Sequence, residues 1–119
     1  PSEIYILAFT LPTLPVIKLG YSSNSTFRMR QVQCNPDLTR GSLLRKIDIE
    51  TGHRAICIEK ALHSHIRRNR PDLIVPPELF RDHIRTTSEV YHRHGKPYIE
   101  ALLDAVKSGW DPHGQSAAA

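Results

Sequence analysis

The alternation of apolar and polar positions predicts three strands in the N-terminal half of the chain. Residues 3–9 and 16–22 are apolar and rich in strand-forming residue types. Residues 10–15, between them, contain two prolines, which cannot donate to a sheet ladder, so they predict the loop of an antiparallel hairpin. Residues 42–50 alternate again and predict a third strand. The apolar side chains expected on one face of this strand are Leu43, Ile47 and Ile49.

Apolar positions three and four residues apart predict helices elsewhere. Residues 24–33 predict a loosely amphipathic helix, and Pro97 is expected to start a last helix that Gly109 ends. The clearest pattern runs from about residue 53 to residue 68, with its apolar face formed by Ala55, Ile58, Leu62 and Ile66. Shorter helical turns are expected at Pro77 and between Thr87 and Tyr91.

These elements predict an α+β fold, with a small three-stranded antiparallel sheet flanked by helices. The length of 119 residues suits one domain. We expect this domain to span residues 1–110, with a core at 3–80 and C-terminal helices at 81–108. Residues 111–119 are expected to form a flexible tail, because they are too few and too featureless to fold alone.

Charge and composition narrow the function only slightly. The 16 Lys and Arg residues exceed the 12 Asp and Glu residues, and this excess suits a polyanionic partner without specifying one. No stretch approaches the roughly 20 apolar residues of a membrane-spanning helix, and the N-terminus lacks an export signal. We therefore expect a cytoplasmic protein, or one in the host cytoplasm if a phage encodes it.

Several polar residues stand within otherwise apolar elements and are candidates for chemistry. Tyr5 and Lys18 lie on adjacent predicted strands that could bring them into contact. A buried lysine is costly unless it is paired or its head reaches solvent. Taken alone, such a lysine is usually an edge residue and such a tyrosine usually packs. Arg28 follows on the next helix, and Glu59 stands among apolar residues on the helix at 53–68.

The order and spacing of these motifs resemble the GIY-YIG nuclease family. The segments that carry the resemblance are Ile4-Tyr5-Ile6, Ile17-Lys18-Leu19-Gly20, Arg28 eight residues after Gly20, and Glu59 on the helix after the third strand. The resemblance covers roughly residues 3–80. It is strongest to a short phage and bacterial branch of the family that has Lys-Ile-Gly in place of Tyr-Ile-Gly.

The resemblance implies metal-dependent hydrolysis of DNA. Glu59 would hold one Mg²⁺ or Mn²⁺, and Arg28 would clamp the scissile phosphate. Tyr5 would act as the general base, with the Lys18 ammonium favouring its phenolate. The open alternative is that Lys18, made neutral by desolvation, is itself the base. Auxiliary positions are Tyr21 at the rim, His63 one turn after Glu59, and the possible phosphate contacts Arg30, Arg67, Arg68 and Arg70.

The chain departs from the family pattern in places. Glu3 stands where the first motif has glycine, and Gln31, Val32 and Gln33 occupy the turn where many relatives have histidine. The alternative function is a non-catalytic DNA-binding or protein-interaction module on the same scaffold, which would keep the basic surface and lack turnover. The presence of all four residues Tyr5, Lys18, Arg28 and Glu59 argues against it. Few segments remain for a separate recognition domain, so specificity would come from the loops, the C-terminal helices, a homodimer or a partner.

A zinc-dependent nuclease is a third hypothesis for the function, suggested by two histidine pairs. The pairs are His63 with His65 and His92 with His94. Residues i and i+2 of a helix face different ways, so neither pair forms a natural ligand set, and we expect both on the solvated surface. Glu59 and His63 do share a helix face, so His63 could orient the glutamate or touch the water shell of the metal ion, but a plain hydrogen bond on the helix surface is the role we expect.

Overall fold

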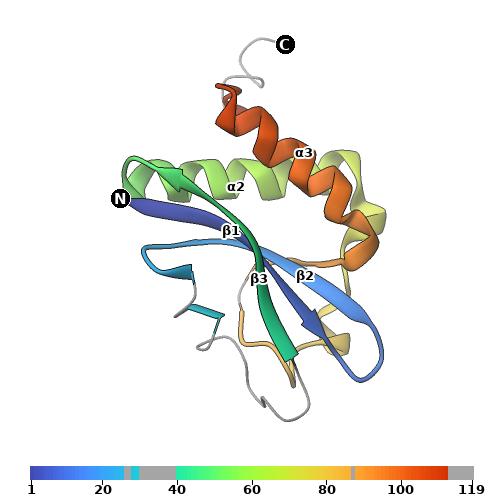
Figure 1. Cartoon of the computed structure of the whole chain (residues 1–119). Coiled ribbons are helices and arrows are strands. Elements are labelled where there is room, and N and C mark those ends of the chain that lie inside the picture. Colours follow the sequence, from blue (N-terminus) through green and yellow to red (C-terminus); the bar gives the residue numbers. More distant parts are fainter. Residues whose placement is uncertain (26–27, 30–39, 87, 113–119) are drawn as a thin grey trace.

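The computed structural model describes residues 1–25, 28–29, 40–86 and 88–112 (Figure 1). The fold is α+β, as predicted. Its centre is an antiparallel sheet of four strands in the order β3-β1-β2-β4. The strands are β1 (Ser2–Thr10), β2 (Pro15–Ser22), β3 (Arg40–Ile49) and β4 (Val90–His92).

Two α-helices lie above the sheet in the orientation of Figure 1. They are α2 (Gly52–Asn69) and α3 (Lys96–Lys107), which confirm the two helices predicted after the third strand. The hydroxyl of Thr51 caps α2 by accepting from the Arg54 backbone N–H, and Gly109, with φ of 106°, follows the end of α3. Single turns of 3-10 helix occupy Pro71–Leu73 (η1), Pro77–Leu79 (η2) and Arg93–Gly95 (η3). Within the described residues, no helix is long and apolar enough to cross a bilayer.

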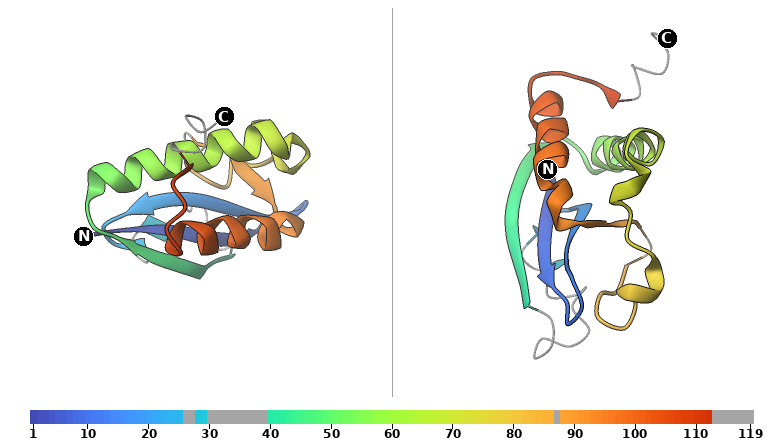
Figure 2. Two further views of the ribbon diagram at one scale, coloured as in Figure 1. Left: turned by 90° about the horizontal axis from the view of Figure 1, so that it is seen from above. Right: turned by 90° about the vertical axis from the view of Figure 1, so that its right-hand side faces the viewer.

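Strand β1 is buried on both faces, and its alternating side chains feed two separate core clusters. Ile4, Ile6 and Ala8 pack with the apolar faces of α2 and α3. Tyr5, Leu7 and Phe9 point to the other face, where they meet Val75, Phe80, Ile84 and Val90. The second cluster therefore depends on the segment between α2 and β4. In the right-hand view of Figure 2, this segment and β3 lie on opposite sides of β1 and β2. Both faces of the central hairpin are thus largely covered, and a polar side chain buried there needs partners.

The sheet differs from the prediction in having a fourth strand. Residues 87–91 were expected to form a helical turn, but Val90–His92 pair with Val16–Lys18 of β2 instead. Tertiary burial explains this, because Val90 and Tyr91 are buried and local capping signals carry no information about it.

The expected face of β3 is also partly wrong, because the strand contains a register shift. Ile6 pairs with Arg45 but Leu7 pairs with Leu43, so Leu44 is an extra residue. Such a bulge reverses the side-chain alternation. Leu43 consequently packs against the cluster around Tyr5, whereas Ile47 and Ile49 pack with α2 and α3.

Two predicted regions lie mainly outside the described residues. They are most of the helix at 24–33, including Arg30, and the tail from residue 113 onward. Of that helix, the structure describes Ser25, Arg28 and Met29 as helical, with the Arg28 N–H donating to the Asn24 carbonyl at 3.0 Å.

Candidate active site

Tyr5 and Lys18 meet on one face of the hairpin across a glycine. Tyr5 pairs directly with Gly20, and Lys18 pairs with Leu7, so the two polar side chains are diagonal neighbours. The Lys18 ammonium nitrogen lies 3.4 Å from the Tyr5 hydroxyl. A Cβ on residue 20 would come within 2.5 Å of that hydroxyl and 2.8 Å of that nitrogen. Glycine is therefore the residue that leaves room for the pair to touch.

Burial changes the protonation of both groups. Tyr5 is fully buried, which raises its pKa to about 12, although the positive charge of Arg28 opposes the rise. Burial lowers the pKa of Lys18 to about 8, against the attraction of Glu59 and with the help of repulsion from Arg28. These directions oppose the idea that Lys18 turns Tyr5 into a phenolate. They favour the alternative, in which Lys18 readily becomes neutral.

Arg28 faces the same pair from a segment anchored to β1. The Glu3 carboxylate accepts hydrogen bonds from the backbone N–H of Ser25 at 3.0 Å and from its hydroxyl at 2.6 Å. Lys46 of β3 adds an ion pair to Glu3 at 3.0 Å. The Arg28 Nε is enclosed and has no acceptor among the described residues. A buried guanidinium N–H without an acceptor suits an anion that enters from the cavity.

Glu59 reaches the pair from α2 past the open end of β2. Because β4 covers β2 only from Val16 to Lys18, the Leu19 carbonyl is left for another donor. His63 Nε2 lies 3.0 Å from this oxygen and 2.8 Å from Glu59 Oε1. The contact expected between Glu59 and His63 is therefore present, but both residues are buried, so its expected place at the surface and the solvated position expected for His63 were wrong. Glu59 and His63 are buried because their turn of α2 packs over the part of β2 that β4 leaves uncovered.

The four residues Tyr5, Lys18, Arg28 and Glu59 line one cavity of about 430 Å³. It brings together all four predicted catalytic residues, the predicted rim residue Tyr21, and a wall that the sequence reasoning missed. Its lining is Tyr5, Lys18, Gly20, Tyr21, Arg28, Glu59, Arg85, Thr86 and Ser88. The groups available for chemistry there are an amine of lowered pKa, hydroxyls, a carboxylate and guanidinium groups around a space open to solvent.

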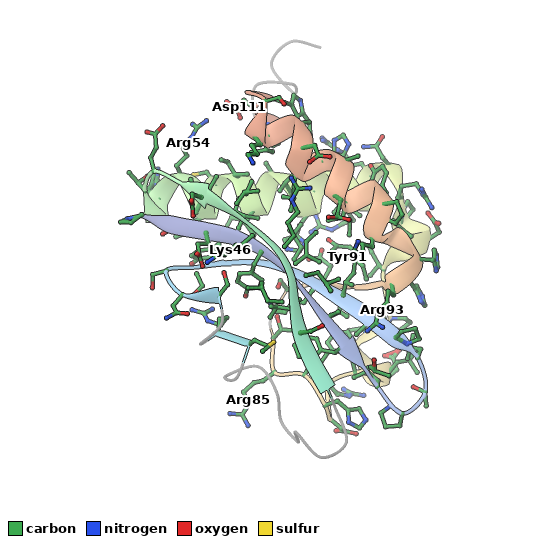
Figure 3. All side chains as sticks on the ribbon, in the orientation of Figure 1. Lys46, Arg54, Arg85, Tyr91, Arg93 and Asp111 are labelled. Carbon is green, nitrogen blue, oxygen red and sulfur yellow. The ribbon has the colours of Figure 1, made fainter. Side chains whose placement is uncertain are left out.

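The missed wall is the segment that carries Arg85, Thr86 and Ser88. Figure 3 shows Arg85 extending from the ribbon into open space. The hydroxyls of Thr86 and Ser88 lie 3.1 Å apart, and the Ser88 N–H donates to the Thr86 hydroxyl at 3.2 Å. The segment has no periodicity that marks it as functional. Only the basic residue itself was a signal, and it is one of many in this chain.

The arginines at the end of α2 are not in this cavity, and two of them have carboxylate partners. Arg67 forms an ion pair with Glu89, and Arg70 forms one with Asp72 while lying over the ring of Tyr98. Arg68 is exposed. Their expected role in DNA binding remains a prediction.

The other three histidines of the pairs considered for zinc, which are His65, His92 and His94, lie against aromatic or imidazole rings. His65 lies against Tyr98 and Trp110, and His92 stacks with His94 at a centroid distance of 5.3 Å.

The donor set at the cavity suits one kind of metal ion. Among the described residues, no group of three or more His, Cys, Asp or Glu side chains could hold a metal. Zinc sites in proteins use three or four protein ligands, so these residues do not fit zinc. Mg²⁺ takes oxygen ligands and commonly keeps several waters beside one or two carboxylates and substrate phosphates, and Glu59 fits that role.

Comparisons of the chain with protein-family models, with curated proteins and with solved structures gave no match.

Proposed function

We propose that this chain is a metal-dependent endonuclease of the GIY-YIG type that hydrolyses phosphodiester bonds in DNA. The observation that carries the proposal is the shared cavity, in which Tyr5, Lys18, Arg28 and Glu59 meet although they come from four separate segments. The motif order noted in the sequence adds support, because those four positions are the ones the resemblance selects. The net positive charge suits the substrate.

Arg28 would hold the non-bridging oxygens of the scissile phosphate. Its guanidinium offers paired N–H donors, of which the enclosed Nε has no acceptor among the described residues. A phosphate in the cavity that Arg28 lines would supply the countercharge and acceptors for the guanidinium. Bidentate contact of this kind fixes the orientation of the phosphorus atom as well as its position.

Lys18 would be the final proton acceptor. With a pKa of about 8 it is partly neutral near physiological pH, whereas Tyr5 with a pKa of about 12 remains a phenol. A neutral amine can accept the hydrogen bond of the Tyr5 hydroxyl at 3.4 Å. The Tyr5 oxygen would then accept a hydrogen bond from the attacking water, take a proton from that water during the attack and give its own hydroxyl proton to Lys18. The water oxygen bonds to phosphorus as the bond to the 3′ oxygen breaks, and the leaving 3′ oxygen takes a proton from solvent.

Glu59 would hold Mg²⁺ or Mn²⁺ through the carboxylate that lines the cavity. When bound, such an ion supplies charge neutralisation at the phosphate and at the leaving 3′ oxygen. DNA in the cytoplasm of the producing or host cell is the substrate that this proposal implies. A second copy or another protein would add sequence specificity, because the cavity offers few groups that could read bases.

A screen of divalent cations tests the proposal against its two rivals. Pure protein is incubated with supercoiled plasmid in Mg²⁺, Mn²⁺, Zn²⁺ or chelator, and DNA binding is measured in parallel by fluorescence anisotropy. We expect cutting in Mg²⁺ or Mn²⁺ and none in chelator. Binding without cutting under every condition identifies a non-catalytic module, and cutting that requires Zn²⁺ identifies a different nuclease chemistry.

A further inference from the structure

The cavity is connected to a buried hydrogen-bonded cluster centred on His63. Its Nε2 faces the Glu59 carboxylate and the Leu19 carbonyl at 2.8 and 3.0 Å. Its Nδ1 faces the Tyr91 hydroxyl at 2.5 Å. The imidazole is thus held from both sides, from α2 and β2 on one and from β4 on the other.

The partners of His63 decide which ring nitrogen carries a proton. A carboxylate oxygen and a backbone carbonyl can only accept, so Nε2 must be the donor to both. The Tyr91 hydroxyl can donate or accept, and it therefore fits Nδ1 in either state. Glu59 Oε1 is consequently fixed by an N–H group that is itself fixed by β2 and β4.

Packing leaves His63 little freedom to turn. It is 4% exposed, and the ring of the fully buried Tyr91 stacks on it with an interplanar angle of 21°. Tyr91, labelled in Figure 3, belongs to the core cluster that includes residues of α2 and α3. A ring flip would place a carbon next to Glu59 and Leu19, which would leave two buried acceptors without a donor.

The cluster also reaches the wall of the cavity. Glu89 Oε2 lies 3.6 Å from His63 Nδ1, and Glu89 follows Ser88, which lines the cavity. The guanidinium of Arg67 holds the other oxygen of Glu89 through its Nε at 2.9 Å. His63 therefore lies between the Glu59 carboxylate and the residue that follows this part of the cavity wall.

We infer that His63, supported by Tyr91 and the Leu19 carbonyl, is a positioning residue that orients the Glu59 carboxylate for the divalent cation. The inference rests on the proposed function for the identity of the cation, and on the hydrogen bonds alone for the geometry. Groups that hydrogen-bond to a metal ligand typically change metal affinity or activity by roughly 10- to 100-fold when they are removed.

The geometric part is tested without metal, DNA or turnover. In a ¹H–¹⁵N correlation spectrum of the imidazole groups, His63 should give a slowly exchanging Nε2–H resonance, because that proton is buried and hydrogen-bonded. Glu59→Gln should shift this resonance, whereas Lys60→Gln, at the neighbouring exposed position, should not. Absence of a protected Nε2–H, or its insensitivity to Glu59→Gln, overturns the inference and leaves the nuclease proposal standing.

The functional part uses Mn²⁺ as the probe. Lys18→Met protein, which should not cleave, is saturated with a short DNA duplex, and Mn²⁺ binding is measured by electron paramagnetic resonance. Adding His63→Leu should weaken Mn²⁺ binding by roughly 10- to 100-fold. Adding His63→Gln, whose amide N–H can still donate to the carboxylate, should restore most of the affinity.

The reference variant in this series is Glu59→Gln. If it binds Mn²⁺ as well as its parent, the cation is not at Glu59, and the metal assignment of the proposed function fails together with the inference. If Glu59→Gln loses Mn²⁺ but a folded His63→Leu protein does not, only the positioning role is wrong. Equal losses for His63→Leu and His63→Gln, with unchanged unfolding temperatures, also contradict a role through the donated hydrogen bond.

Discussion

At the scale of single residues, Lys18 is placed where an ammonium group costs stability. Its side chain is almost fully buried, and burial brings its pKa down to about 8. A lysine pKa that is lower in the folded than in the unfolded state means that the unfolded chain binds more protons between these two values. Stability should therefore rise as pH increases from about 8 toward the ordinary lysine pKa of about 10.4.

Lys18→Met should separate stability from activity. At pH 7 the variant should be more stable by about 1–3 kcal/mol, because it removes the burial of a charge. The wild-type cleavage rate should increase with pH and level off above a pKa near 8, where the amine is neutral. The variant should lose this rise. Urea unfolding and single-turnover rates from pH 6 to pH 9 check both effects, and a variant that cuts with the wild-type pH profile would exclude Lys18 as the base.

Gly20 offers a second test at the same scale. Gly20→Ala places a methyl group against the Tyr5 hydroxyl and the Lys18 amine, both of which are enclosed. We expect a loss of about 1–3 kcal/mol in stability and of most cleavage activity. Gly52→Ala is the matched control, because its Cβ would lie 3.4 Å from the nearest side chain, the Ser2 hydroxyl. Equal behaviour of the two variants in thermal unfolding and plasmid cutting would show that the close approach at Gly20 is unimportant.

At the scale of elements, Glu3 connects β1 to the segment that carries Arg28. The hydrogen bond from the Ser25 hydroxyl is the main cause that holds the Glu3 pKa below its ordinary value, although partial burial opposes it. The stabilisation is present above the unfolded pKa and is lost as pH falls through the lower folded pKa.

We therefore expect Glu3→Gln to lower stability at pH 7 by about 1–2 kcal/mol and to slow cleavage. The stability difference from wild type should shrink at acidic pH, where Glu3 is protonated in both states. Asp48→Asn, an equal charge change on the exposed residue opposite Glu3 in the sheet, should have little effect. Denaturant unfolding at pH 7 and pH 3 measures the difference, and a constant difference at both values would argue against a charged Glu3 as the anchor.

The elements themselves were largely predictable, because local patterning reports local structure. The hairpin, β3, α2 and α3 follow from turn residues, alternation and helical spacing. Strand β4 did not, since its three residues form a strand only by pairing with β2. The bulge at Leu44 was likewise invisible, and it moved Leu43 to the opposite face from Ile47.

Only those residues of the candidate site that belong to a motif with the expected spacing could be predicted from the sequence. Tyr5, Lys18, Arg28 and Glu59 were selected by order along the chain, and they do line one cavity. The burial of His63 was missed, because helical spacing shows which residues share a face but not that the face crosses an open sheet edge. Arg85 was missed because it reaches the cavity through the course of a loop.

At the scale of the whole molecule, the cavity has arginines on two separate segments. Arg28 lies on the segment after β2, and Arg85 lies on the loop before β4. A DNA strand whose phosphate reaches Arg28 would pass Arg85. Positive charge elsewhere on the surface would attract DNA without positioning it.

Arg85→Gln should therefore weaken DNA binding and lower its dependence on salt. One lost phosphate contact reduces the slope of log affinity against log salt concentration by about 0.9. Arg81→Gln is the control, because Arg81 is exposed nearby but does not line the cavity. Anisotropy titrations at several salt concentrations, in chelator to prevent cutting, give both slopes. If the two variants have the same slope, DNA does not follow this wall.

The central claim is that this cavity cleaves DNA, and Glu59 is the residue that most directly decides it. Wild-type protein, Glu59→Gln and Glu78→Gln should be compared for cleavage of supercoiled plasmid in Mg²⁺, with DNA affinity measured in chelator; Glu78 is exposed in η2 and does not line the cavity. We predict that Glu59→Gln stays folded and binds DNA as wild type does but does not cut, while Glu78→Gln cuts normally. Full activity in a folded Glu59→Gln protein would contradict the claim.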